Sequence, residues 1–129
     1  MQRRACLNIL GSTALAAVAR GAHPAHPIQV YVDLSVDPAR EKQMLQHFEK
    51  DFKPAAAKFA GYIDVKMLKL RSAFQGEAPA GLNYRFVLTY QSEELRQRWI
   101  ASDVHQKVWG MIENTMRNKD YAVLLFDVM

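Results

Sequence analysis

The chain has 129 residues, half of them apolar, and a formal net charge of +4. Arg3, Arg4 and Arg20 lie near the N-terminus, and the 108 residues after position 21 carry 14 basic and 13 acidic side chains with the signs interspersed. That length fits one small domain. A nucleic-acid-binding surface needs clustered Lys and Arg to displace counterions, so the composition argues against a nucleic-acid partner.

The N-terminal segment has the pattern of an export signal. Arg3 and Arg4 precede an uncharged run over residues 9–19, and small residues follow around Ala19 and Gly21. A twin-arginine signal has paired arginines, an apolar run too short to span a bilayer, and a cleavage site with small residues two positions apart. We therefore expect residues 1–21 to be removed, leaving a periplasmic or secreted protein with no stable membrane anchor. The general secretory route is the alternative.

Neither thiol nor metal chemistry is expected in the mature chain. The single cysteine, Cys6, lies in the signal segment ahead of its apolar run, which excludes disulfides and thiolate nucleophiles from the rest. Residues 22–27 contain His23 and His26, each followed closely by a proline that favours extended backbone. This pattern predicts a linker. Weak metal binding by the two histidines is the alternative, but no further ligand lies at a useful spacing.

Residues 28–129 alternate between strand and helix patterns. Apolar side chains with a period of two predict strands over residues 28–36, 63–68 and 84–90, and a strongly apolar run predicts a fourth strand over residues 121–128.

Two helical regions separate these strands. Asp37 and Pro38 supply a cap and a first helical position for a helix that Pro54 should kink or restart and Gly61 should end. The second helical region follows the cap residue Ser92 and restarts at residues 102–103. Residues 71–81, rich in Gly and Pro, form the longest loop.

The element order βαββαβ predicts an α+β fold of the ferredoxin-like type, an antiparallel sheet with helices on one face. The other sheet face has no helices to cover it, yet its side chains are too apolar to be simply solvated. They are Tyr31, Asp33, Asp64, Lys66, Leu68, Arg85, Val87 and Thr89. Packing two such sheets face to face would bury them, and we therefore expect a homodimer in which acidic and basic side chains meet across a twofold axis.

The candidate site residues lie in the second helical region. Trp99 lies one turn after Leu95, while His105 and Trp109 begin a second apolar stripe at i and i+4. His105 is a candidate acid or base near neutral pH, with a structural role as the alternative. Core packing is likewise the alternative to a pocket wall for both tryptophans.

Two segments, FAGY at 59–62 and YQSEELRQRWIASDVH at 90–105, together with the βαββαβ order, resemble the antibiotic biosynthesis monooxygenase family of dimeric αβ barrels. The resemblance covers residues 28–129 and implies a homodimer with a pocket between each sheet and its helices. Some members oxidise electron-rich aromatic or quinol substrates with O₂ and without metal or flavin, so no cofactor is expected. In such a pocket, His105 would be catalytic. The substrate-binding side chains would be Trp99, Trp109, Tyr84 and Tyr90.

The helix around Trp99 is also similar to that of the haem-degrading branch of this family. Ten residues later, where that branch has its iron-ligating histidine, the chain has Trp109, and the first-strand asparagine is replaced near Val32. An indole nitrogen donates a hydrogen bond and cannot ligate iron, which argues against ordinary haem degradation.

The leading hypothesis is an exported, homodimeric, monooxygenase-like protein acting on a small aromatic or quinol compound. The alternative is a binding or accessory module of the same fold without chemistry. The sequence discriminates poorly between them, because it contains no paired carboxylates, metal-ligand set, nucleophile triad or glycine-rich phosphate loop.

Overall fold

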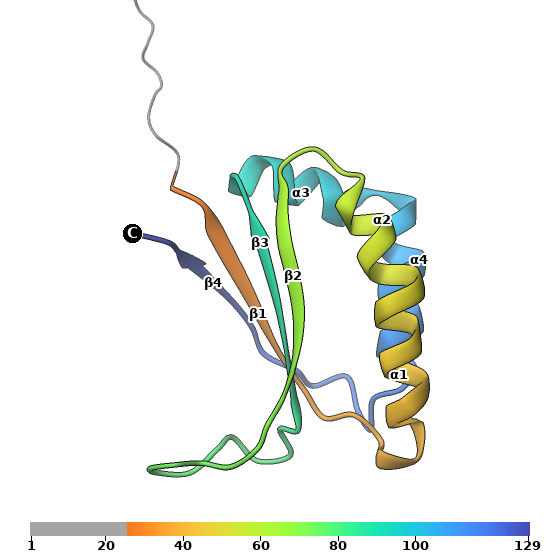
Figure 1. Ribbon diagram of the computed structural model, residues 1–129, viewed down its shortest axis with the longest axis vertical. Coiled ribbons are helices and arrows are strands. Elements are labelled where there is room, and N and C mark those ends of the chain that lie inside the picture. Colours follow the sequence, from red (N-terminus) through yellow and green to blue (C-terminus); the bar gives the residue numbers. More distant parts are fainter. Residues whose placement is uncertain (1–25) are drawn as a thin grey trace, which may run out of the picture.

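Four strands form one antiparallel sheet in the computed structural model, which describes residues 26–129. The strands are β1 (Ile28–Leu34), β2 (Tyr62–Lys69), β3 (Tyr84–Tyr90) and β4 (Val123–Asp127), in the spatial order β2-β3-β1-β4. All helices lie on one side of the sheet (Figure 1). The ferredoxin-like βαββαβ prediction is therefore confirmed. The predicted export signal and most of the predicted linker lie outside the described residues.

The helical stretch between β1 and β2 changes its winding along its length. It runs through a 3₁₀ turn η2 (Pro38–Arg40), helix α1 (Glu41–His47), a π-helical turn η3 (Phe48–Phe52) and helix α2 (Lys53–Ala57). Asp37 caps its start, as predicted, by accepting a hydrogen bond from the backbone N–H of Ala39. Pro54 follows the π turn. Because proline donates no N–H and crowds the carbonyl four residues earlier, the predicted kink takes the form of a wider turn.

Two predictions at the start of β2 were wrong. The helix ends at Ala57, and Gly61 instead forms the turn into β2 with a φ of 95°. A Cβ at Gly61 would lie 2.7 Å from Leu95, so only glycine fits between this turn and the following helix. Ile63, predicted to face inward, lies in a β-bulge that breaks the register between Tyr62 and Asp64, and its side chain is exposed.

The second helical region is divided into α3 (Glu93–Ala101) and α4 (Asp103–Glu113), as the sequence predicts. Ser92 caps α3 by accepting from the N–H of Leu95. Ser102 has an extended backbone between the helices and caps α4 by accepting from the N–H of His105. Only Ser102 separates the end of α3 from the start of α4, and its extended backbone breaks the helical path.

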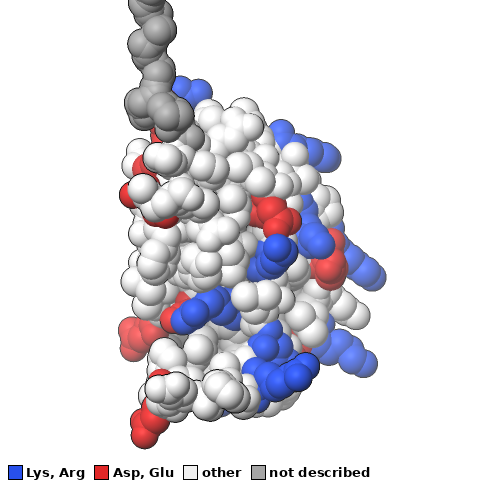
Figure 2. Space-filling model, turned by 60° about the vertical axis from the view of Figure 1, so that its left-hand side comes forward, with Lys and Arg blue, Asp and Glu red and all other residues white. Residues whose placement is uncertain are grey.

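The sheet face without helices carries charged pairs and exposed apolar side chains side by side. Arg85 contacts Asp33 at 2.6 Å, and Lys66 contacts Asp64 at 3.2 Å. The apolar residues Leu68, Leu124 and Phe126 are also exposed, Phe126 by 50%. We call this surface the open face. Figure 2, turned so that this side comes forward, shows a broad uncharged surface with a few neighbouring acidic and basic groups.

The loop over residues 70–83 leaves the sheet at the end of β2 and extends away from the helices, past the open face (Figure 1). Phe74 in this loop is fully exposed. The open face and the loop therefore border the same side of the molecule.

Candidate functional site

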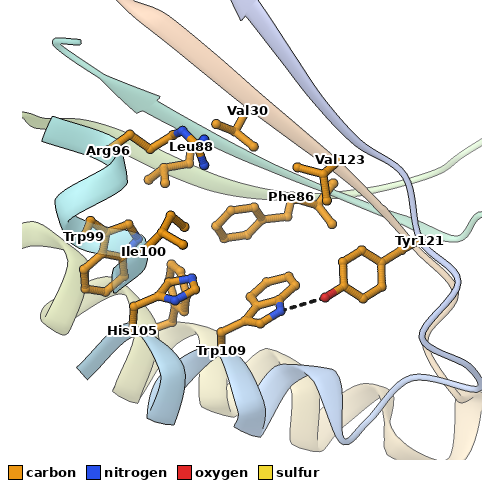
Figure 3. A pocket seen from close by; sticks show the side chains of 12 residues that line it. Val30, Phe86, Leu88, Arg96, Trp99, Ile100, His105, Trp109, Tyr121 and Val123 are labelled. Atoms are coloured by element: carbon orange, nitrogen blue, oxygen red, sulfur yellow. Dashed lines mark hydrogen bonds between the residues drawn. The ribbon is translucent and has the colours of Figure 1, made fainter. Parts of the chain in front are cut away.

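An apolar pocket of about 290 Å³ lies between the sheet and the helices α3 and α4 (Figure 3). Side chains from β1, β3, β4, η3, α3, α4 and the loop before β4 line it. Its volume lies at the lower end of the range of small-molecule sites, roughly 300–1,000 Å³. The pocket therefore has room for a compound of one or two rings.

Phe52 connects the aromatic side chains around this pocket. Its ring makes edge contacts with those of Trp99 at 5.7 Å, Phe86 at 5.1 Å and Trp109 at 6.1 Å. His105 lies parallel to Trp109, with 6.4 Å between the ring centroids. Such edge and offset contacts are favourable for aromatic rings. Because Phe52 belongs to the π turn, the unusual winding before Pro54 helps to set where this ring lies.

Two buried nitrogen atoms of the pocket residues have no hydrogen-bond partner within residues 26–129. They are Nε1 of Trp99, whose side chain is fully buried, and Nδ1 of His105. The two rings lie 5.0 Å apart, Trp99 at the end of α3 and His105 at the start of α4. Leaving a buried polar atom unpaired costs about 1–3 kcal/mol, and such atoms in a folded protein call for an explanation.

The imidazole of His105 is held in its neutral form. Burial lowers its pKa below the ordinary value of 6.5, a hydrogen bond to the Ile100 carbonyl opposes this, and the positive charge of Arg96 lowers the pKa further. Nδ1 has no hydrogen-bond partner within residues 26–129, and in the tautomer that carries the proton on Nε2 it keeps its lone pair. His105 is then able to accept a proton at neutral pH.

Tyr121 fixes the position of Trp109. Trp109 Nε1 donates to the hydroxyl of Tyr121 at 3.1 Å, and that hydroxyl donates to Glu113 at 2.8 Å. Burial raises the pKa of Tyr121, so its hydroxyl stays protonated. Trp109 is therefore a wall of the pocket that presents its ring surface, and its N–H is already used.

Arg96 is the charged residue of the described pocket lining, and the sequence analysis did not single it out. Glu93 holds its guanidinium through two hydrogen bonds, to Nε at 2.6 Å and to Nη2 at 2.9 Å. The side chain of Arg96 is 17% exposed and that of Glu93 is 35% exposed. From the sequence, this pair looks like any surface ion pair at i and i+3, and only the fold shows that Arg96 lies at a pocket.

The structure does not bring Tyr84 and Tyr90 to this pocket, although both were predicted to bind substrate. They lie at opposite ends of β3, and Phe86 and Leu88 between them reach the pocket instead. The hydroxyl of Tyr84 donates to Glu41 at 2.5 Å, and Tyr90 is fully buried. Burial is the main cause that raises the pKa of each to about 12.

Two kinds of feature are absent from residues 26–129, a metal-ligand cluster and a membrane-spanning helix. No group of three His, Cys, Asp or Glu side chains there could hold a metal ion. Likewise, none of the helices in this part of the chain is both long enough and apolar enough to cross a membrane.

No protein-family model and no curated protein matches the sequence. The fold does match solved structures. A dimeric ferredoxin-like protein of unknown function from Jannaschia has a TM-score of 0.67 at 16% identity, over 79% of this chain and 99% of that one. A candidate antibiotic biosynthesis monooxygenase from Caulobacter crescentus has a TM-score of 0.64 at 17% identity, over 83% and 93%. SnoaB, a cofactor-independent oxygenase from Streptomyces nogalater, has a TM-score of 0.63 at 12% identity, over 81% of this chain and 94% of that one.

The chain has the fold of the antibiotic biosynthesis monooxygenases. Identities this low show the fold alone, because one fold hosts many activities. The resemblance found in the sequence is thus confirmed for the architecture, and the chemistry has to be argued from the pocket.

Proposed function

We propose that the mature protein is an exported, homodimeric monooxygenase that oxidises a small aromatic or quinol compound with O₂, without metal or flavin. The observation that carries this proposal is the neutral, partly buried imidazole of His105 beside Trp99 in an apolar, aromatic pocket. Its architecture also occurs in SnoaB, which is described as a cofactor-independent oxygenase. The alternative is a binding module that uses the same pocket without chemistry.

The proposed reaction begins with proton transfer from a substrate hydroxyl to His105. The resulting phenolate passes one electron to O₂, and the two radicals combine to form a C–O bond at a ring carbon that bears hydrogen. His105 then returns its proton to the peroxide anion, which gives a hydroperoxide and restores the neutral imidazole. Loss of water from this hydroperoxide leaves a quinone, so one oxygen atom stays in the product and the other leaves as water. An apolar enclosure supports this sequence because it excludes water from the radical pair.

The open face supports the homodimer. It combines exposed apolar residues such as Phe126 with charges that are already paired within the chain, Arg85 with Asp33 and Lys66 with Asp64. A second copy can cover such a surface without burying an unpaired charge. A protein of the same fold is described as dimeric. Light scattering at micromolar concentration should give the mass of a dimer, and a monodisperse monomer would contradict the proposal.

Export is proposed from the sequence of residues 1–21. Replacing Arg3 and Arg4 together by Lys should leave unprocessed protein in the cytoplasm, because the twin-arginine route depends on the arginine pair. Undiminished export would indicate the general secretory route.

Oxygen consumption tests the reaction. A panel of quinols and phenols is offered to the parent protein and to the His105→Ala, Trp99→Phe double variant, and substrate-dependent O₂ uptake should occur only in the parent. His47→Ala is a matched control, because His47 lies on α1, where it contacts Asp51 outside the pocket. Ligand binding without O₂ uptake in any of these proteins would favour the binding module.

A further inference from the structure

We infer that the pocket takes an anionic ligand, a one- or two-ring aromatic compound whose carboxylate or other oxyanion is received by Arg96. The inference rests on the proposed function in one respect, that this pocket is the binding site. It adds the charge of the ligand, which neither the fold nor the resemblance specifies.

The polar groups around the pocket are one-sided. Arg96 brings a positive charge and N–H donors, and Trp99 brings an indole N–H that has no acceptor within residues 26–129. No Asp or Glu belongs to the described lining, and the hydroxyl of Tyr121 is already used by Trp109 and Glu113. A ligand that complements these groups supplies acceptor oxygens, and a negative charge on it suits Arg96, while His105 takes up a proton.

Arg96 is held in place for this role. Glu93 engages Nε and Nη2 and leaves Nη1 free of any hydrogen bond to the described residues. Figure 3 shows Arg96 extending along the pocket towards Leu88 and Val30, on the side of Ile100 opposite His105. Because Glu93 is the more exposed member of the pair, solvent screens its charge more than that of Arg96. The positive charge is already felt inside the pocket, where it helps to lower the pKa of His105.

The orientation of Trp99 adds a second, independent observation. Its side chain is fully buried, and its nitrogen lies on the edge of the ring that faces Ile100, another residue of the pocket lining (Figure 3). A planar ligand anchored at Arg96 would bring its ring oxygens towards this N–H and towards His105. Planar guanidinium groups suit carboxylates because they can donate two parallel hydrogen bonds.

The test uses pairs of probes that differ in charge and little in shape: benzoate with benzamide, and 2-naphthoate with 2-naphthamide. Affinities for the purified protein are measured by tryptophan fluorescence and calorimetry. The carboxylate should bind about tenfold or more tightly than its amide. Arg96→Met should reduce this ratio to about one, and Arg96→Lys should keep part of it. Thermal unfolding verifies that each variant is folded.

Two further variants sharpen the result. Glu93→Gln removes the competing carboxylate, so the preference for the anionic probe should rise. Arg98→Met is the matched control, since Arg98 lies on the same helix with its side chain 70% exposed and outside the pocket lining. Equal affinities in the parent, an unchanged ratio in Arg96→Met, or no binding of any probe at millimolar concentration would overturn the inference.

Oxygen uptake separates this inference from the proposed function. Selective binding of naphthoate without O₂ uptake from any phenolic acid would uphold the inference and contradict the monooxygenase. O₂ uptake with equal kcat/KM for neutral and anionic phenols would support the monooxygenase and contradict the inference of an anionic ligand.

Discussion

The two faces of the sheet treat polar groups in opposite ways. On the open face, charged side chains find partners within the chain, as Arg85 does with Asp33, while apolar side chains such as Phe126 stay exposed. On the helix-covered face, apolar side chains are enclosed, while Trp99 and His105 each keep a buried nitrogen that has no partner in the part of the chain that the structure describes. On the open face, apolar side chains such as Phe126 lack a cover. On the helix-covered face, the two nitrogen atoms lack hydrogen-bond partners within residues 26–129.

This difference separates two kinds of incompleteness. A surface with satisfied charges and exposed apolar groups is completed by a broad, non-directional cover, which a second copy can supply. A pocket with unsatisfied, directional atoms is completed by a small molecule that places acceptors at those atoms. The same sheet can therefore serve assembly with one face and ligand binding with the other.

The largest effect is expected from Trp99→Ala. Trp99 is fully buried and contacts the rings of Phe52, Phe59 and His105. Truncating a buried aromatic side chain costs roughly 3–5 kcal/mol, so the free energy of unfolding measured in urea should fall by about that amount. A loss below about 1 kcal/mol would show that Trp99 lines a space open enough to refill.

The matching change on the open face is Phe126→Asp. Its side chain is half exposed, so the folded monomer should be retained, while a charge in the middle of an apolar contact should dissociate the dimer. Sedimentation equilibrium would show the shift from dimer to monomer. Lys50→Asp, which also introduces a carboxylate but on the exposed side of the first helical stretch, is the control and should leave the mass unchanged.

Much of this fold follows from local sequence patterns. Alternation identified β1 and β3, and the caps at Asp37, Ser92 and Ser102 placed the helix starts, because each depends on residues only a few positions apart. The errors at Gly61 and Ile63 have a different origin. The close approach of Leu95 to Gly61 and the bulge beside β3 are contacts between segments distant in sequence, which periodicity does not report.

The candidate site was predictable in part for the same reason. Trp99, His105 and Trp109 share one helical region, and the structure places all three at the pocket. Their functional roles stay predictions. Tyr84 and Tyr90 have the same alternation as the pocket residues of β3, and only the position of the helices shows that the pocket lies over the middle of the strand.

A smaller effect on stability is expected from Trp109→Ala, with a larger effect on binding. Trp109 is only partly buried, and its N–H is tied to Tyr121 at the side of the pocket. Aromatic contacts contribute about 0.5–1.5 kcal/mol beyond buried area, so affinity for 2-naphthoate should fall several-fold or more while the melting temperature changes little. A large fall in melting temperature with unchanged affinity would instead make Trp109 a core residue.

The smallest effect concerns the pH dependence of stability. Because folding lowers the pKa of His105 below 6.5, the unfolded chain binds a proton there more readily than the folded protein does. Well above pH 6.5 both states are neutral at this position. As the pH falls from 6.5 through the folded pKa, the unfolded state gains protons first, and the free energy of unfolding should decrease.

Urea denaturation at pH 7.5 and 5.5 should therefore show a larger loss for the parent than for His105→Gln. The lowered pKa values of Glu41 and Glu93 act below about 4.5, outside this window. Equal losses in the two proteins would mean that His105 is as accessible to protons in the folded state as in the unfolded chain, and the neutral base in the proposed reaction would lose its support.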